Sequence, residues 1–203
     1  MSEIICVTNR LLCRENFLER IKKIAQSKPS GIILREKDLT EQEYKKLSEV
    51  VIDICRSNNV RCILHNFVNT ALELNHTSLH LPLPVLQELP DDKKNNFKIL
   101  GASCHSEEDA VKAEKSGCTY ITAGHIFDTD CKKGLPGRGI DFLKKICSCV
   151  SIPVYAIGGI NSENISEVIE AGAAGACIMS GAMTYENLPE YFKGFEENKN
   201  EIQ

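Results

Sequence analysis

The sequence lacks any long apolar run, and this excludes one large class of proteins. None of its hydrophobic stretches approaches the roughly 18 residues that a helix needs to cross a bilayer, so we expect no membrane-spanning segment. The chain also lacks an excess of basic residues, because 24 Lys and Arg stand against 28 Asp and Glu, for a net charge of −4. A non-specific nucleic-acid binder requires a basic face. We therefore expect neither nucleic acid nor a membrane as a partner.

Features of an exported protein are also missing. The first residues, MSEIICVTNR, have neither the basic start nor the long apolar stretch of a signal peptide. We therefore expect a cytoplasmic protein in which the ten cysteines stay reduced. No Cys-x-x-Cys pair is present, so the cysteines do not match the spacing of zinc ligands. We interpret them as buried or incidental thiols, since free cysteine packs as a small hydrophobic residue.

What the sequence does contain is a regular alternation of short apolar runs and charged, amphipathic stretches. Several runs are apolar at consecutive positions, which is typical of strands covered on both faces. The predicted strands are Ile4–Val7, Gly31–Leu34, Arg61–Leu64, Ser78–Leu81, Lys98–Ala102, Tyr120–Ala123, Pro153–Ile157 and Ala176–Met179. Alternating βα units indicate an α/β protein with a parallel sheet, and eight units predict a closed (β/α)8 TIM barrel. We expect residues 1–203 to form one such domain.

Helix start signals support this alternation. Asn16 precedes an apolar stripe as a candidate N-cap. Thr40 has Glu43 three residues later, which is the pattern of a capping box. Ser106 opens a stretch with three acidic residues in its first turn. Two further helices are predicted over Asn161–Ala171 and from Pro189 to about Glu197.

Two glycine-containing segments follow the last two predicted strands. AIGGI includes Gly158 and Gly159, and MSGAM includes Ser180 and Gly181. Small residues let backbone N–H groups approach a ligand closely, and helix N-termini favour anions. The loops after strands seven and eight of (β/α)8 barrels often bind phosphate in this way. The glycines could instead serve only tight turns, but their occurrence at two consecutive strand ends favours phosphate binding.

Charged residues follow two other strands. Arg35, Glu36 and Lys37 come directly after the second strand, and we expect them to face the active site, although a solvated surface ion pair is the alternative. The longest irregular segment, Gly124–Gly139, is expected on the catalytic face of the barrel. It contains His125, which can take and give a proton near neutral pH, and Lys132 and Lys133, which could close over an anion.

At these residues the sequence resembles the thiamine phosphate synthase and TenI superfamily over nearly its whole length. The shared motifs are VTNR at Val7–Arg10, LREK at Leu34–Lys37, the KK-GLPGRG segment at Lys132–Gly139, IPVYAIGGI at Ile152–Ile160, and MSGAM. The resemblance implies the TIM barrel and a small phosphorylated substrate. Synthases of this superfamily join a pyrimidine pyrophosphate to a thiazole phosphate with the help of Mg²⁺.

The chain departs from the synthase pattern at the metal site. The two carboxylates that hold Mg²⁺ in the family would fall on Asn66 and Val85, and neither side chain can replace a carboxylate as a magnesium ligand. The glutamine that synthases place two residues before the arginine is Ile33 here. We therefore expect no metal ion and no other cofactor.

The GHIFDTDCKKG segment is similar instead to the TenI branch, which is known for a thiazole tautomerase. This resemblance implies an isomerase of thiamine biosynthesis that aromatises a carboxythiazole phosphate, with His125 as the catalytic proton shuttle. Substrate-binding residues would be Arg35, Lys37, Lys133, Gly158, Gly159, Ser180 and Gly181. The alternatives are a Mg²⁺-dependent thiamine phosphate synthase, which is a transferase, and a non-catalytic, regulatory TenI-like protein that binds a phosphorylated ligand. A homo-oligomer is possible in each case.

Overall fold

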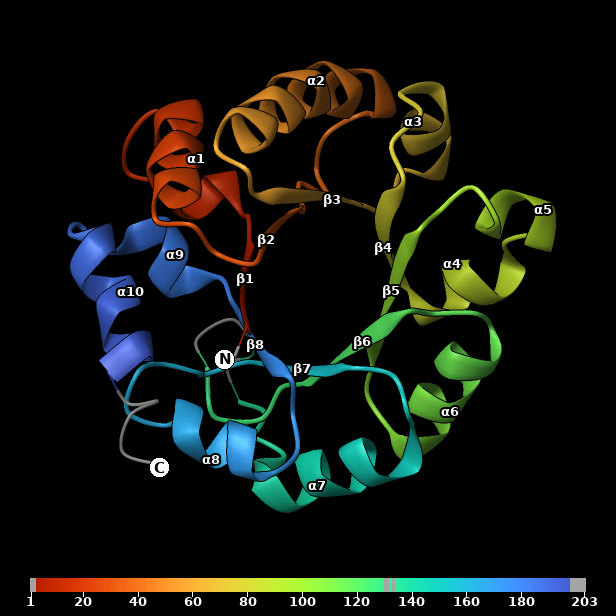
Figure 1. The fold of residues 1–203 in the computed structure, drawn as a ribbon, viewed down its shortest axis with the longest axis vertical. Helices are drawn as coiled ribbons and strands as arrows, with labels where there is room; N and C mark the ends of the chain where they lie inside the picture. The colour runs from red at the N-terminus through yellow and green to blue at the C-terminus, as the bar shows by residue number, and fades with distance from the viewer. Residues whose placement is uncertain (1–2, 130–131, 133, 198–203) are drawn as a thin grey trace.

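The computed structural model describes residues 3–129, 132 and 134–197. Eight parallel strands pair in sequence order, and β8 pairs with β1, so that the sheet closes into a barrel. Figure 1 shows the strands as an inner ring and the helices as an outer ring. The strands are β1 (Glu3–Val7), β2 (Gly31–Leu34), β3 (Arg61–His65), β4 (Ser78–Pro82), β5 (Ile99–Cys104), β6 (Tyr120–Gly124), β7 (Val154–Ile157) and β8 (Gly175–Ile178). The predicted (β/α)8 barrel is confirmed.

The helices that follow the strands complete each βα unit. They are η1 (Arg10–Leu12), α1 (Phe17–Gln26), α2 (Glu41–Ser57), α3 (Val68–Glu73), α4 (Leu83–Glu88), α5 (Asp91–Lys94), α6 (Glu107–Lys115), α7 (Gly139–Cys149), α8 (Ile165–Glu170), α9 (Ser180–Thr184) and α10 (Leu188–Glu197). In the part of the chain described by the structure, none of these helices combines the length and apolar character required to traverse a bilayer.

The predicted N-caps begin their helices. The Asn16 side chain accepts hydrogen bonds from the backbone N–H groups of Leu18 and Glu19 at the start of α1. Thr40 and Glu43 form the predicted capping box of α2. One helix is shorter than predicted: α8 begins only at Ile165, because the Asn161 side chain accepts hydrogen bonds from the N–H groups of Glu163 and Asn164. This local turn satisfies those donors outside a helix.

Two apolar layers hold the barrel together. The larger one lies between the sheet and the helices, and it includes strand residues such as Leu34 and Leu79 that are fully buried. The smaller one fills the interior of the barrel and contains Ile5, Val7, Ile33, Ile63, Tyr120, Tyr155 and Cys177. Because successive strand residues point to opposite faces, every strand except β4 contributes to both layers. This explains why the strand sequences are apolar at consecutive positions.

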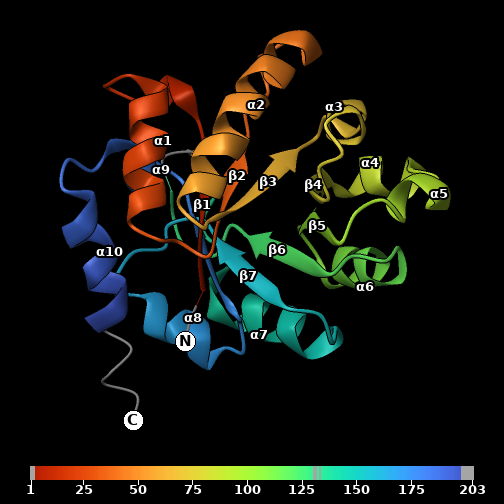
Figure 2. The ribbon, with the colours of Figure 1, turned by 45° about the horizontal axis from the view of Figure 1, so that its top comes forward.

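The first helix of the outer ring lies beside the last two helices. Figures 1 and 2 both show α1 beside α9 and α10. The buried Arg20 side chain of α1 donates hydrogen bonds to the backbone carbonyls of Ala182 (2.8 Å) and Tyr185 (2.6 Å). A charged donor satisfies carbonyls that the short helix α9 leaves without a helical partner. The segment that follows β8 is thereby fixed to the first helix of the ring.

Candidate active site at the carboxyl ends of the strands

The charged residues after β2 divide into two kinds. Glu36 is buried: its carboxylate accepts a hydrogen bond from the Thr8 hydroxyl at 2.6 Å and two from the Arg10 backbone N–H at 3.0 and 3.1 Å. The expectation that Glu36 faces the active site is therefore wrong. Its carboxylate instead fastens the segment after β1 to the segment after β2, because a buried carboxylate needs donors to compensate for lost water.

Arg35 and Lys37 flank this carboxylate and are differently placed. Ile33 belongs to the barrel interior, so the alternation of the strand directs Arg35 toward the same side. Partial burial, together with the positive charges of Arg35 and Lys132, lowers the pKa of Lys37. Neither Arg35 nor Lys37 forms an ion pair with another described residue. Like charges held close together, with no carboxylate in ion-pair contact with them, form a site for an anion.

The histidine that ends β3 borders this cationic cluster. His65 is buried, and burial, with smaller contributions from His80, Arg35 and Lys37, lowers its pKa to about 2. Its ring stacks on that of His80 in β4, with 5.9 Å between the ring centroids. The two imidazoles are neutral at physiological pH, so the positive charge at the barrel mouth comes from Arg35, Lys37 and Lys132.

His80 makes contacts that sequence reasoning missed. Its Nδ1 lies 2.9 Å from the hydroxyl of Tyr120, and its Nε2 lies 2.9 Å from the hydroxyl of Ser103. Burial lowers the pKa of His80 to about 3 and raises that of Tyr120. The three residues come from β4, β5 and β6, and Ser103 is half-buried near the carboxyl end of its strand. Only the register of the sheet reveals this cluster.

The loop after β6 covers part of the same face, as predicted. His125 follows the strand directly and is 9% exposed, and its Nε2 lies 3.2 Å from the carbonyl oxygen of Leu135. The backbone N–H of Gly137 donates to the Asp128 carboxylate at 2.6 Å, and that of Arg138 donates to the His125 carbonyl at 3.0 Å. His125 is thus enclosed by its own loop. Lys133, predicted to bind substrate, lies outside the described residues.

The four small residues predicted to bind phosphate lie after β7 and β8 at the same end of the barrel. Gly158 and Gly159 both have positive φ, +101° and +68°, and a side chain on Gly158 would overlap His125. A side chain on Gly181 would overlap the hydroxyl of Tyr191. Packing therefore contributes to the choice of glycine at Gly158 and Gly181. Gly159, Ser180 and Gly181 are all at least partly exposed.

A magnesium site of the family type does not fit the residues present. Asn66 stands after β3 with an amide in place of a carboxylate, and Val85 packs against the core from α4. Glu36 and Asp38, the acidic residues nearest to the cations, are both bonded to Arg10. In the described part of the chain, no three His, Cys, Asp or Glu side chains are grouped to hold a metal ion. Hard divalent cations prefer carboxylate oxygens.

Comparisons with known proteins agree with this arrangement at the level of the family. The family model described as thiamine monophosphate synthase matches residues 4–182. Thiamine-phosphate synthase 2 of Streptococcus pneumoniae serotype 4 is 34% identical over 195 residues, covering 93% of this chain and 91% of the relative. Thiamine-phosphate synthase of Caldanaerobacter subterraneus subsp. tengcongensis is 36% identical, covering 81% of each chain. The solved thiamine phosphate pyrophosphorylase of Pyrococcus furiosus superposes with a TM-score of 0.84 at 27% identity, covering 99% of this chain and 96% of that one.

These findings overturn the expected activity. The sequence predicted an isomerase of the tautomerase type, yet relatives at 30–36% identity over most of the chain are named as synthases, which are transferases. The prediction relied on a single loop histidine and on two positions of the metal site. His125 is enclosed by backbone of its own loop, and such an environment does not by itself specify proton transfer to a ligand. The chain belongs to the thiamine monophosphate synthase family.

Proposed function

We propose that this protein is a thiamine-phosphate synthase that acts on two phosphorylated small molecules, a pyrimidine pyrophosphate and a thiazole phosphate. In this transfer, the bond between the pyrimidine-bearing carbon and the pyrophosphate oxygen breaks. The thiazole nitrogen forms the new bond to that carbon, and pyrophosphate leaves with the electron pair. Such a reaction needs positive charge where the leaving group develops its negative charge.

The observation that carries the proposal is the group of cations after β2. Lys37 lies close enough to Arg35, and to Lys132 of the β6 loop, for their charges to lower its pKa in addition to the effect of its partial burial. The Glu36 carboxylate is bonded to Thr8 and Arg10, and it forms no ion pair with Arg35 or Lys37 among the described residues. We assign this cluster to the pyrophosphate. Its positive charge stabilises the leaving group more strongly as the carbon–oxygen bond breaks.

The second substrate is assigned to the part of the barrel mouth that follows β7 and β8. Gly158, Gly159, Ser180 and Gly181 would hold the phosphate of the thiazole through backbone amides. The two proposed anion sites then share the mouth of one barrel, so that the two reacting groups meet above its interior. Proximity of this kind accounts for a large share of the barrier lowering in two-substrate reactions.

His125 needs a different role in this reaction, since the transfer moves no proton between carbon atoms. We propose that it anchors the loop over the site through the contact of its Nε2 with the Leu135 carbonyl. Closure of such a loop excludes water, which would otherwise compete with the thiazole for the reactive carbon. Lys133 stays a predicted substrate-binding residue.

The test is a direct assay of the purified protein. Hydroxymethylpyrimidine pyrophosphate and thiazole phosphate are supplied together, and thiamine phosphate and pyrophosphate are measured by mass spectrometry and a pyrophosphate assay. We expect the two products in equal amounts. Pyrophosphate release without thiamine phosphate, or no product with and without Mg²⁺, would refute the proposal.

A further inference from the structure

We propose that Tyr120 and His80 are positioning residues that fix the direction of the Ser103 hydroxyl, so that it donates a hydrogen bond to the substrate bound at the barrel mouth. This inference rests on the proposed function for the identity of the substrate. The hydrogen-bond relay itself rests only on residues of β4, β5 and β6.

The sheet register brings the first two residues together. His80 of β4 pairs with Gly101 of β5, and Gly101 pairs with Tyr120 of β6, so the three lie in one row across the barrel wall. A side chain on Gly101 would overlap the Tyr120 ring and hydroxyl. The missing side chain therefore lets the tyrosine cross over β5 and place its hydroxyl 2.9 Å from His80 Nδ1.

The protonation states leave two arrangements of these hydrogen bonds, one for each neutral tautomer of His80. Burial keeps Tyr120 protonated and His80 neutral at physiological pH, and a neutral imidazole has one N–H and one bare nitrogen. Among the residues described here, His80 Nδ1 is the only acceptor within reach of the Tyr120 proton. Because Tyr120 is buried whereas half-buried Ser103 is open to a ligand, we assign the tautomer in which Tyr120 donates to Nδ1 and the imidazole proton lies on Nε2. From there it is donated to the oxygen of Ser103.

Ser103 is the last residue of this hydrogen-bond relay and the one nearest to the proposed substrate site. In this arrangement the Ser103 oxygen accepts from His80, so its own proton points elsewhere, and apart from His80 Nε2 the described part of the chain provides no acceptor for it. Ser103 lies two residues nearer the carboxyl end of β5 than Gly101, and it is half-buried. His80 also stacks on His65, which borders Arg35 and Lys37. The serine proton is thus directed into the space beside the cation cluster.

The relay is tested first without any activity measurement. The ¹⁵N spectrum of protein labelled at histidine distinguishes the two neutral tautomers, and a His80→Gln variant identifies the signals of His80. We expect the Nε2–H tautomer in the wild type between pH 6 and pH 8. In Tyr120→Phe the donor to Nδ1 is lost, and a mixture of tautomers is expected. Predominance of the Nδ1–H tautomer in the wild type would overturn the proposal.

The link to the substrate is tested by a double-mutant cycle on kcat/KM for thiamine phosphate formation. A neutral hydrogen bond is worth about 1 kcal/mol, so Ser103→Ala is expected to lower kcat/KM by roughly fivefold to tenfold. Tyr120→Phe should have a smaller effect of the same sign. In the Ser103→Ala background, Tyr120→Phe should change nothing further, because its effect passes through that hydroxyl. Independent, multiplicative losses would show that Tyr120 is merely structural.

Tyr155→Phe is the matched control. Tyr155 is also a buried tyrosine of the barrel interior, but its hydroxyl donates to Glu3, 2.6 Å away. We expect this variant to keep the His80 tautomer and the kcat/KM of the wild type, although its melting temperature falls. If the wild type forms no thiamine phosphate, the proposed function fails while the tautomer result still decides whether the relay exists.

Discussion

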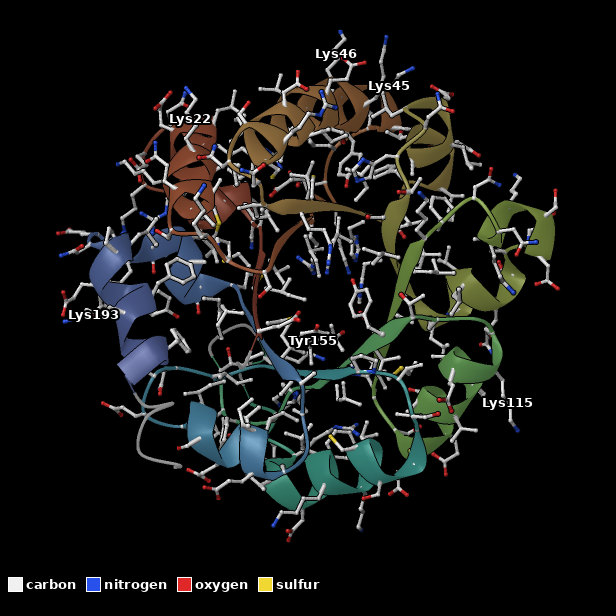
Figure 3. All side chains as sticks on the ribbon, in the orientation of Figure 1. Lys22, Lys45, Lys46, Lys115, Tyr155 and Lys193 are labelled. Carbon is white, nitrogen blue, oxygen red and sulfur yellow. The ribbon has the colours of Figure 1, made fainter. Side chains whose placement is uncertain are left out.

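Two tyrosines inside the barrel use the same geometry and reach different partners. Tyr120 crosses Gly101 to His80, and Tyr155 of β7 crosses Gly175 of β8 to Glu3 of β1. Gly101 leaves room for the Tyr120 ring, whereas Gly175 leaves room for the Glu3 backbone, and in Figure 3 Tyr155 lies inside the ring of strands. The first row leads toward the barrel mouth and ends on a serine hydroxyl. The second row lies at the amino ends of the strands and ends on a carboxylate.

The difference shows how the chain separates stability from activity. At the amino ends, the Tyr155 hydroxyl is fully used by an internal carboxylate. At the carboxyl ends, Arg35 and Lys37 have no ion pair within the described residues, and apart from His80 Nε2 the Ser103 proton has no acceptor there. Unsatisfied polar groups cost stability unless a ligand completes them. Changes at the mouth should therefore affect turnover, and changes to internally bonded groups should affect folding.

The largest expected effect comes from removing both cations after β2. Arg35→Ala combined with Lys37→Ala removes the positive charge assigned to the leaving pyrophosphate. We expect kcat/KM to fall by about a thousandfold, since loss of one such electrostatic contact typically costs 10²–10³. The melting temperature should stay within a few degrees, because neither side chain has an internal ion pair among the described residues.

The matched control is Lys45→Ala with Lys46→Ala on α2. These two lysines point outward in Figure 3, and the double variant changes the net charge by the same amount. It should leave kcat/KM unchanged. A comparable loss in the control would mean that overall charge, and not the cluster, accounts for the effect.

Glu36→Gln tests the second half of this comparison, the groups that are bonded within the protein. Glu36 lies at the barrel mouth, but its carboxylate is hydrogen-bonded to other residues of the chain. The buried carboxylate accepts from the Thr8 hydroxyl and the Arg10 backbone, and hydrogen bonds to a charged group are worth about 1.5–3 kcal/mol. We expect the free energy of unfolding to fall by about 3 kcal/mol, measured by urea denaturation. Asp38→Asn, which removes an exposed partner of Arg10, should destabilise far less. Equal losses would contradict the structural role of Glu36.

Much of this fold follows from the sequence, because strand period and helix caps are local signals. Gly31–Leu34 is predicted with its observed bounds, and Asn16 and Thr40 start their helices as expected. The short helices α3 and α4 have no side-chain cap hydrogen bond and gave no such signal. Helix α8 was predicted too long because Asn161 starts a turn before it.

The site was predictable only where residues follow a strand directly. Arg35, Lys37 and His125 were placed at the mouth for this reason. Glu36 is bonded to Thr8, 28 residues away, and His80 contacts Tyr120, 40 residues away. A local sequence pattern cannot reveal partners that are so distant in the chain. The prediction of a tautomerase gave more weight to single substitutions than to the similarity of the whole chain. The relatives, which are named as synthases, contradict it.

Acid should weaken the fold through the neutral histidines of the mouth. The pKa values of His65 and His80 are about 2 and 3 in the folded protein, whereas unfolded histidine titrates near 6.5. Below pH 6.5 the unfolded chain therefore binds protons that the folded protein does not, and the free energy of unfolding falls as the pH falls.

Above about pH 7 both imidazoles are neutral in either state, so they cause no pH dependence there. Between pH 7 and pH 5.5 we expect a loss of about 2 kcal/mol for the pair, measured by urea denaturation at each pH. His65→Gln cannot titrate and should show roughly half of this loss. If the variant loses as much stability between pH 7 and pH 5.5 as the wild type, a group other than His65 causes the loss.

The smallest expected effect is that of removing divalent metal. Asn66 and Val85 occupy the positions of the family carboxylates, and Glu36 and Asp38 are bonded to Arg10. The side chains available at the mouth are therefore cationic or neutral. Such groups bind pyrophosphate oxygens directly and do not attract Mg²⁺. We expect kcat/KM in excess EDTA to stay within about twofold of its value in Mg²⁺. Titration calorimetry with inorganic pyrophosphate in EDTA should show binding that the Arg35→Ala variant weakens. Turnover that stops on chelation and returns with Mg²⁺, or pyrophosphate binding that requires the metal, would show that the cluster does not replace the missing carboxylates.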